Sequence, residues 1–239
     1  MRVGSFLFNI LFWAWIAVLG LGLLPVCLVY RPFSFTVARV WGVGTLFLLR
    51  HLCGITYTVR GREHIPAGAA LVASKHQSAW DTVIFWILLE KPAYVLKKAL
   101  IYFPVFGWYL LLLENIYIDR KSGASAMKHM LRSAVTLKKR NRPIVIFPEG
   151  TRIRPSAASV YHPGVAALYQ QMQVPVVPVA LNSGLCWSRN AFIKKPGNIT
   201  IEFLPPIAPG MRGRDFMKTL QEQVDAATNA LVQTPPPAA

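Results

Sequence analysis

A histidine and an aspartate five positions apart, His76 and Asp81, are the residues in this sequence best suited to catalysis. They stand in the stretch ALVASKHQSAWDT, where an apolar run predicts a buried strand and the residues from Thr82 onward predict a helix. Positions five apart on one continuous helix point about 140° away from each other. The two side chains can therefore meet only if His76 lies on the loop and Asp81 lies in the first helical turn. Strand-to-helix loops are the usual location of active sites in open α/β folds.

In that geometry the carboxylate of Asp81 can accept the Nδ1–H of His76. This hydrogen bond would fix the tautomer and leave Nε2 free to act as a base. The other interpretation is a hydrogen-bonded pair with a purely structural role. From these residues alone, both interpretations stay open.

A second group, FPEGTR (Phe147–Arg152), follows the strand-like run IVIF. Its proline and glycine predict a turn at the carboxyl end of that strand, which would present Glu149 and Arg152 at the same sheet edge as His76. An arginine at this place suits a phosphate, through paired charge-assisted hydrogen bonds. The alternative is a surface ion pair between Glu149 and Arg152, which would contribute little to stability.

Three more cations are expected near that edge. Arg120 ends the motif NIYIDR after another strand-like run, and Lys97 and Lys98 stand in YVLKKAL. Each alone would be read as a solvated surface charge. Because they converge with Arg152 on one edge, the sequence predicts a site for an anion.

The elements that would position these residues alternate along the chain from residue 55. Short runs rich in β-branched residues predict strands: ITYTV, ALVAS, NIYI, IVIF, VPVVPVAL and NITIEF. Helix-like stretches occur at Thr82–Glu90, Ser122–Arg140, Gly164–Met172 and Arg214–Val232. The alternation predicts an α/β domain over residues 55–234, a mostly parallel sheet flanked by helices, followed by a disordered tail at 235–239. Pro175 and Pro178 argue against a central place in the sheet for VPVVPVAL.

Residues 1–54 are predicted to form a helical membrane anchor. Ser5–Tyr30 carries no charge and is long enough to cross about 30 Å of hydrocarbon as a helix. More arginines follow this segment than precede it, so the positive-inside rule places the following domain in the cytoplasm. Phe33–Cys53 is a second apolar stretch. It is compatible with a helix in the membrane interface, with a hairpin, or with a buried helix of the globular domain.

The composition fits an anionic partner at a membrane surface. Hydrophobic residues make up 54% and charged residues only 15%, yet the formal net charge is +16. A nucleic acid is not expected, because the cations are scattered among apolar segments rather than gathered in a solvated stripe. The three cysteines are widely spaced, and no cluster of His, Cys and carboxylates has the spacing of metal ligands. We therefore expect neither a metal nor a cofactor.

Four of these motifs resemble, in this order, the sequence blocks of the glycerolipid acyltransferase family: HQSAWD, NIYIDR, FPEGTR and VPVVPV. The resemblance is greatest to bacterial 1-acyl-sn-glycerol-3-phosphate acyltransferases. It implies transfer of an acyl group from a thioester, either acyl-CoA or acyl-carrier protein, to the sn-2 hydroxyl of 1-acyl-sn-glycerol 3-phosphate. The product would be phosphatidic acid, made at the bacterial inner membrane by a catalytic domain on the cytoplasmic side.

The resemblance also implies roles for individual residues. His76 and Asp81 would be the catalytic pair, with His76 removing the proton of the acceptor hydroxyl and Asp81 orienting it. Substrate binding is implied for Arg120, Glu149, Gly150, Thr151 and Arg152, together with Lys97 and Lys98. The partners would be the thioester donor, a lysophospholipid acceptor and membrane lipids.

Three positions depart from the pattern of that family, and one of them is His162, which stands in YHPG where a lysine-containing stretch often precedes the helix. Lys75 precedes the histidine where many members have asparagine, and we expect it to steer anionic donors or raise the local potential. Glu114 stands where a glycine usually opens the arginine block.

Three other functions are weighed against this one. A relative of the same family could acylate a lyso-ornithine lipid or another lysophospholipid. A non-catalytic membrane-binding protein of the same fold would have no use for His76, Asp81 and FPEGTR together. A lipid-ester hydrolase is disfavoured because the sequence lacks a G-x-S-x-G nucleophile motif.

Overall fold

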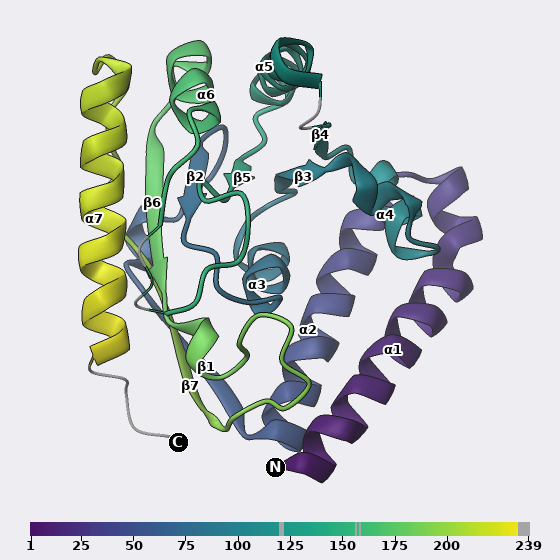
Figure 1. Ribbon diagram of the computed structural model, residues 1–239. Coiled ribbons are helices and arrows are strands. Elements are labelled where there is room, and N and C mark those ends of the chain that lie inside the picture. Colours follow the sequence, from purple (N-terminus) through teal and green to yellow (C-terminus); the bar gives the residue numbers. More distant parts are fainter. Residues whose placement is uncertain (120–121, 156, 158, 234–239) are drawn as a thin grey trace.

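The computed structural model describes residues 1–119, 122–155, 157 and 159–233, and they form a mostly parallel sheet between two layers of helices (Figure 1). The strands are β1 (Ile55–Arg60), β2 (Leu71–Ser74), β3 (Ala93–Lys97), β4 (Ile116–Ile118), β5 (Ile144–Ile146), β6 (Val176–Leu181) and β7 (Gly197–Phe203). Their order is β1-β7-β6-β2-β5-β3-β4, and among these described strands only β6 and β7 pair antiparallel. The expected fold class is confirmed.

Helices cover both faces of the sheet. They are α1 (Arg2–Val29), α2 (Phe33–Cys53), α3 (Trp80–Leu88), α4 (Phe106–Leu112), α5 (Gly123–Lys139), α6 (Gly164–Met172) and α7 (Gly213–Gln233), with short 3-10 helices η1 (Arg62–His64), η2 (Lys98–Tyr102) and η4 (Ser183–Leu185). One hydrophobic cluster joins the sheet to α1, α2 and α3, and a second joins it to α5, α6 and α7. Figure 1 shows these two groups of helices on opposite sides of the strands.

Successive residues of the central strands point to opposite faces of the sheet and so contribute to both clusters. In β2, Leu71 and Ala73 belong to the cluster under α5, α6 and α7, whereas Val72 belongs to the cluster under α1, α2 and α3. The three residues of β5 alternate in the same way. A strand buried on both faces reads as a continuous apolar run, and the sequence shows such runs here.

The two N-terminal helices form an antiparallel hairpin. Gly44 of α2 lies against the Trp15 ring of α1, and the Nε1–H of Trp15 donates to the Trp41 carbonyl at 3.2 Å. The buried side of α2 packs on α3. The stretch Phe33–Cys53 is thus both one arm of a hairpin and a half-buried helix of the globular part. Of the helices described, only α1 is long and apolar enough to cross a membrane, with a mean hydropathy of 2.3.

Several short elements, the 3-10 helices among them, were not predicted from the sequence. The motif YVLKKAL, interpreted only as a source of cations, forms β3 and the start of η2. The helix α4 also falls where no element was predicted. Each of these elements is too short to display a hydrophobic period that identifies it. The longer helices begin and end within about three residues of the predicted bounds, which is a usual uncertainty of such limits.

The expectation that VPVVPVAL avoids the centre of the sheet is wrong, because β6 lies between β7 and β2 and contains Pro178. The next residue, Val179, faces β2 and accepts the N–H of Lys75 at 2.9 Å. Pro178 faces the other way, and its carbonyl accepts the N–H of Leu204 at 2.9 Å. The register with β7 begins at the pair Val179 and Phe203. The ladder position that proline cannot fill therefore lies beyond the end of β7.

Candidate active site

His76 and Asp81 meet at the carboxyl end of β2. His76 lies on the loop after this strand, and Asp81 is the second residue of α3. The Nδ1 atom of His76 is 2.9 Å from Oδ2 of Asp81. His76 is 9% exposed and Asp81 is fully buried. The loop-and-first-turn placement is the one that the spacing of five requires.

The carboxylate of Asp81 is held by donors on every side. Its Oδ2 accepts the backbone N–H groups of Gln77 at 2.7 Å and Ser78 at 2.8 Å, and its Oδ1 accepts the hydroxyl of Ser183 at 2.5 Å. Asp81 also lies in the first turn of α3, where the positive end of the helix dipole stabilises a negative charge. An ionised carboxylate can only accept hydrogen bonds, so Nδ1 of His76 carries the proton and Nε2 is the basic nitrogen.

The imidazole ring lies on an aromatic surface beside a cavity. It stacks on the Phe147 ring with centroids 4.0 Å apart and planes 17° apart. His76 also lines a cavity of about 630 Å³. A base that is fixed through Nδ1 and supported on one ring face can present Nε2 to a substrate with little loss of rotational freedom.

Glu149 of FPEGTR lies behind the histidine loop. Its Oε2 accepts the backbone N–H of His76 at 2.9 Å, and its Oε1 is 2.9 Å from Nζ of Lys75. The residue is 3% exposed and is not among the described residues that line the cavity. Burial raises the pKa of this carboxyl, and the contact with Lys75 opposes that effect. Glu149, expected to bind substrate, is placed where it shapes the histidine loop.

Gly150 makes the turn that brings FPEGTR back to the loop. Its φ of +62° lies in the left-handed region that glycine adopts without strain. Three residues later, the N–H of Ile153 donates to the carbonyl of His76 at 2.8 Å. With Glu149 bound to the N–H of His76, the backbone of the histidine is held at both of its polar groups.

Arg152 supplies a half-buried cation to the same cavity. It lines the cavity together with Gly150 and Thr151. Burial is the main cause that lowers the pKa of Arg152; Asp81 opposes it, and Arg189 lowers it further. A guanidinium keeps its proton under such conditions. The cavity therefore combines an oriented base with a fixed positive charge.

The other predicted cations are divided. Lys97, at the end of β3, lines the cavity. Lys98 begins η2, is exposed, and is not among the described lining residues. Arg120, also predicted to bind substrate, lies outside the described residues.

Sequence reasoning missed three residues of the site. Arg189 lines the cavity and donates to the Arg152 carbonyl at 3.1 Å. The hydroxyl of Ser183 donates a hydrogen bond to Asp81, and Oε1 of Gln77 accepts the N–H of Gly184 at 3.0 Å. The NSG at the end of VPVVPVALNSG was the available signal for Ser183. A single arginine in a loop carries no spacing that would identify it.

Two of the departures from the family pattern occupy unusual positions. Lys75 is 5% exposed and lies against carboxylates, so the expectation that it steers anionic donors is wrong. Glu114 adopts φ +54°, a left-handed conformation that glycine takes without strain.

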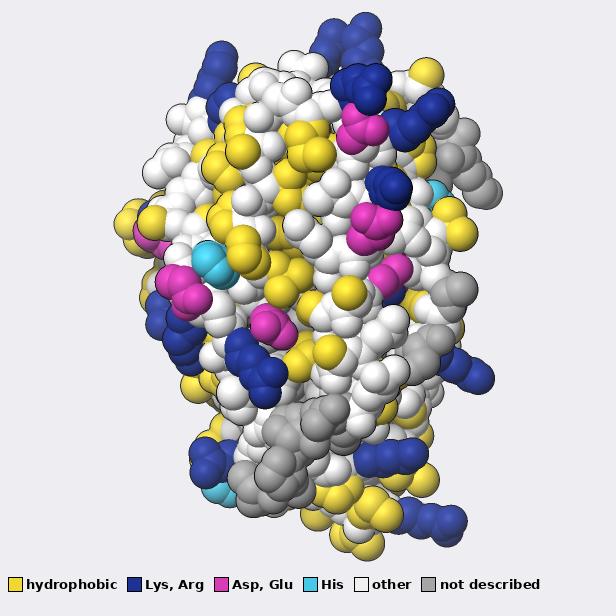
Figure 2. All heavy atoms as spheres, turned by 90° about the vertical axis from the view of Figure 1, so that its left-hand side faces the viewer, with side chains coloured by type: hydrophobic (Ala, Val, Ile, Leu, Met, Phe, Trp, Pro, Cys, Tyr) yellow, Lys and Arg dark blue, Asp and Glu magenta, His cyan; other side chains and the backbone are white. Residues whose placement is uncertain are grey.

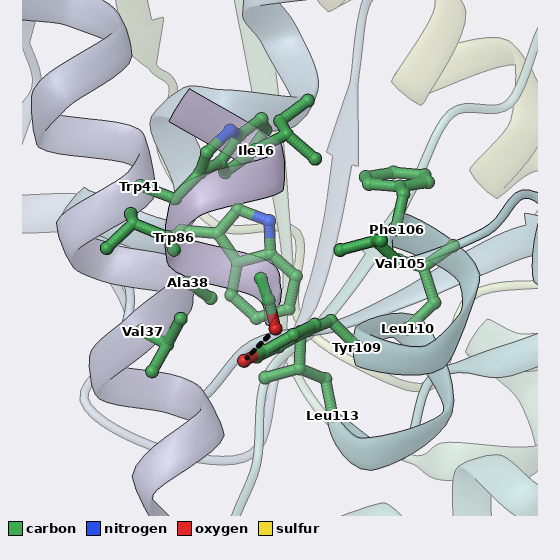
Figure 3. Close-up of a pocket in the computed structure, with 12 residues that line it drawn as sticks. Ile16, Val37, Ala38, Trp41, Trp86, Val105, Phe106, Tyr109, Leu110 and Leu113 are labelled. Atoms are coloured by element: carbon green, nitrogen blue, oxygen red, sulfur yellow. Dashed lines mark hydrogen bonds between the residues drawn. The ribbon is translucent and has the colours of Figure 1, made fainter. Parts of the chain in front are cut away.

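A second cavity lies away from this chemistry, between α1, α2 and α4 (Figure 3). It has a volume of about 60 Å³ and an apolar lining that includes Trp41 and Trp86. The hydroxyl of Tyr109 donates to the Gly20 carbonyl at 3.1 Å along its wall. This volume is small beside a site for a drug-sized ligand, and we interpret the cavity as a packing gap between the hairpin and the domain.

The sequence of this chain is similar to those of known acyltransferases. The family model described as "Acyltransferase" matches residues 56–182. A 1-acyl-sn-glycerol-3-phosphate acyltransferase of Pseudomonas aeruginosa is 35% identical over 190 residues, which cover 80% of this chain and 74% of that protein. One from Limnanthes douglasii is 30% identical over 78% of this chain and 67% of that protein.

A solved structure has the same fold. The crystal structure of the 1-acyl-sn-glycerophosphate (LPA) acyltransferase PlsC from Thermotoga maritima matches with a TM-score of 0.77 over 99% of this chain and 100% of that chain, at 20% sequence identity. The extent of the family match and the 35% identity lead to one conclusion. This chain belongs to the acyltransferase family.

Proposed function

We propose that the protein acylates the sn-2 hydroxyl of 1-acyl-sn-glycerol 3-phosphate with an acyl group from a thioester, giving phosphatidic acid. The observation that carries the proposal is the pairing, in one cavity, of the oriented base His76 with the half-buried cation Arg152. The names of the relatives in bacteria and plants support the same acceptor.

The reaction needs a base, and His76 is placed to serve as one. Its Nε2 would take the proton of the acceptor hydroxyl while the hydroxyl oxygen attacks the carbonyl carbon of the thioester. The new ester bond forms as the carbon–sulfur bond breaks, and the thiolate recovers the proton from His76. Asp81 stabilises the imidazolium that exists between these two transfers. General-base assistance of this kind is typically worth about 10²–10⁴ in rate.

The arginines of the cavity are suited to bind the phosphate of the acceptor. A phosphomonoester carries roughly −1.5 to −2 charges near neutral pH. Arg152, with Arg189 beside it, can bind this group and set the glycerol hydroxyl against His76. A lyso-ornithine lipid has a carboxylate and an amine instead, and it would gain less from two arginines.

The donor is an acyl thioester carried by coenzyme A or by acyl-carrier protein. Both carriers are anionic, and the net charge of +16 attracts either one. Because both present the same thioester bond, the chemistry at His76 is the same for each.

We further propose that the hairpin α1–α2 holds the enzyme on the cytoplasmic face of a bacterial inner membrane. Contacts at both ends of α1 tie it to the globular part. At its start, Ser5 bonds the backbone of Lys194, and just beyond its end Arg31 donates to the Leu112 carbonyl at 2.8 Å. A helix laid along the domain in this way suits insertion into one leaflet, with its exposed apolar side in the lipid.

One assay tests the proposed reaction. Purified protein in mixed micelles receives a labelled acyl thioester and, in parallel, lysophosphatidate, a lyso-ornithine lipid and lysophosphatidylcholine. We expect the highest kcat/KM with lysophosphatidate. Equal or greater activity on the phosphate-free lyso-lipid would transfer the assignment to that acceptor, and release of free fatty acid without acceptor would indicate a hydrolase.

A further inference from the structure

The buried ammonium of Lys75, the residue before the base, lies close to three side-chain oxygens. Its Nζ is 2.7 Å from Oδ1 of Asp225, 2.9 Å from Oε1 of Glu149 and 3.0 Å from the hydroxyl of Ser159. An ammonium has three hydrogens, and here three oxygens surround it. The Tyr161 ring lies 5.9 Å from the same nitrogen. Burial lowers the pKa of Lys75, but the two carboxylates outweigh that effect and raise it.

These contacts form a continuous path from the C-terminal helix to the base. Asp225 lies on α7, and its carboxylate meets Lys75. Lys75 meets Glu149, whose other oxygen binds the backbone N–H of His76. Asp225 has no part in lining the cavity, as far as the described residues show. It touches neither the base nor the space where a substrate would lie.

The buried charge of Lys75 explains why Asp225 is needed in addition to Glu149. A buried ammonium opposite one carboxylate is neutral overall but leaves hydrogens to satisfy, and an unsatisfied buried charge is costly. The side chain of Lys75 is 6% exposed, whereas that of Asp225 is 31% exposed. The partly solvated Asp225 therefore anchors the ammonium at modest desolvation cost and keeps it directed at Glu149. An asparagine at position 75 would carry no charge and would not need this anchor.

A second set of contacts ties α7 to the other member of the catalytic pair. The side-chain amide of Gln221 donates to the carbonyl of Ser159 at 3.0 Å. Near the end of α7, the Leu231 carbonyl accepts from the side chain of Asn182 at 3.2 Å. Asn182 directly precedes Ser183, which bonds Asp81. The helix thus contacts both the segment that bonds Lys75, next to His76, and the segment that carries Ser183, the partner of Asp81.

Figure 1 shows α7 at the side of the molecule opposite α1, and Figure 2 looks onto that side, where acidic side chains are interspersed with Lys and Arg. These carboxylates lie far from the proposed membrane face. One of the acidic residues of α7, Asp225, reaches inward to a buried lysine, whereas Glu222 is 67% exposed and pairs weakly with Lys218 at 3.9 Å.

We propose that Asp225 is a positioning residue for the base His76, acting through Lys75 and Glu149. The inference rests on the proposed function, because it assigns His76 as the base. It makes the C-terminal helix a working part of the active site, although that helix lies outside the matched family segment 56–182. The presence of lysine at position 75 would be what makes this chain dependent on α7.

The first experiment measures steady-state kinetics of Asp225→Asn with lysophosphatidate and a thioester donor. We expect kcat to fall about tenfold, because a small displacement of a catalytic group is costly in rate. Both KM values should stay within about twofold, since Asp225 lies away from the cavity. The matched control is Glu222→Gln on the same helix, which should leave kcat and both KM values unchanged.

The second experiment is a double-mutant cycle with Lys75→Asn. If Asp225 acts only through Lys75, then Asp225→Asn should have no further effect on kcat in the Lys75→Asn background. Lys75→Gln repeats the cycle should Lys75→Asn fail to fold, as judged by its melting temperature. An equal loss of kcat in both backgrounds, or no loss in the wild-type background, would overturn the inference.

A third readout separates this inference from the proposed function. Diethyl pyrocarbonate modifies exposed imidazoles, and peptide mass spectrometry resolves the rate at His76 from that at the other histidines. We expect Asp225→Asn to raise the rate at His76 several-fold, with no such rise in Lys75→Asn. Absence of acyl transfer by the wild-type protein would refute the proposed function, and the modification rates would still decide the role of Asp225. Unchanged modification rates at His76 would contradict the proposed role of Asp225.

Discussion

The carboxylate of Asp81 has no exposed surface, and its described contacts are all donated hydrogens from imidazole, amides and a hydroxyl. Charge-assisted hydrogen bonds of this kind are each worth roughly 1.5–3 kcal/mol and offset the cost of burying the charge. An asparagine would bring an NH₂ group to a site built from donors. The local structure is thus matched to a carboxylate and to one tautomer of His76.

The catalytic pair yields the first prediction. His76→Ala should reduce kcat by about 10²–10⁴, because the acceptor hydroxyl loses its base. Asp81→Asn should also reduce kcat strongly, because the imposed tautomer and the stabilising charge are both lost. Steady-state assays with a labelled thioester measure both effects, and the melting temperature monitors folding.

The control for this prediction is a second histidine of the same cavity. His162 lines the cavity but is exposed and lies on the segment before α6. His162→Ala should retain most of the activity. If His76→Ala turns over within a few-fold of wild type, His76 is not the base.

The cavity arginines yield the second prediction. Arg152→Ala should raise the KM for lysophosphatidate by ten- to a hundredfold, since one charge-assisted bond of roughly 1.5–3 kcal/mol is lost. The KM for the thioester donor should change much less. Arg189→Ala, at an exposed position, should give a smaller change for the acceptor. A larger change in the KM of the donor than of the acceptor would contradict the assignment of Arg152 to the acceptor phosphate.

At the scale of elements, Glu114 joins three segments at one turn. It follows α4, and its carboxylate lies 3.5 Å from Arg31 after α1, 2.6 Å from Arg140 after α5 and 3.1 Å from Arg142. The left-handed conformation of Glu114 costs of order 1–3 kcal/mol. Contacts with three arginines offset this strain, which accounts for a glutamate at a position whose conformation favours glycine.

The third prediction is a dependence of stability on pH. Burial raises the pKa of Glu114, but the three arginines outweigh it and lower the pKa below 4.5. A carboxyl whose pKa is depressed on folding contributes stability above its unfolded pKa, and this contribution is lost as the pH falls through the folded pKa. We therefore expect wild type to lose stability below about pH 4.5 more steeply than Glu114→Gln.

Urea unfolding in detergent micelles at pH 7 and at pH 4 measures this difference. Glu114→Gln should be less stable than wild type by about 1 kcal/mol at pH 7, because two of the arginines are half-exposed and screened. The control is Glu90→Gln, whose side chain is 79% exposed and 3.9 Å from Lys91. Equal pH dependence in wild type and Glu114→Gln would refute the assignment.

At the scale of the whole molecule, the hairpin decides how the enzyme meets a membrane. The contacts of α1 with the globular part run from Ser5, which bonds Lys194, to Gly20, which bonds Tyr109. Lys194 itself is 2% exposed and lies 5.0 Å from the Phe8 ring of α1. A helix that crossed the bilayer alone would have to give up these contacts.

The fourth prediction follows from that arrangement. A protease-sensitive tag added at the N-terminus should be cleaved from the same side of sealed membrane vesicles as the globular part. This side should be the cytoplasmic one, as the distribution of arginines predicts. Inside-out and right-side-out vesicles, each treated with protease, distinguish the cases. Cleavage of tag and body from opposite sides would show that α1 spans the bilayer.

Local pattern was enough to predict the fold class and much of the site. The continuous apolar runs of β2 and β5, the helix-like stretches of α5 and α7, and the spacing of His76 and Asp81 depend on residues that are neighbours along the chain. The same is true of the turn at Gly150, which the proline and glycine of FPEGTR indicate. These features follow from backbone geometry, and the sequence by itself determined them.

Only the tertiary structure decided which charges are buried and which face the cavity. Glu149 meets the N–H of His76 across 73 positions, and Lys75 meets Asp225 across 150. In the sequence these residues look like surface cations and carboxylates, because the free energy of a charge depends on solvent access and on distant partners. The same reason applies to Pro178, whose place in a central strand is tolerated because β7 has already ended beside it.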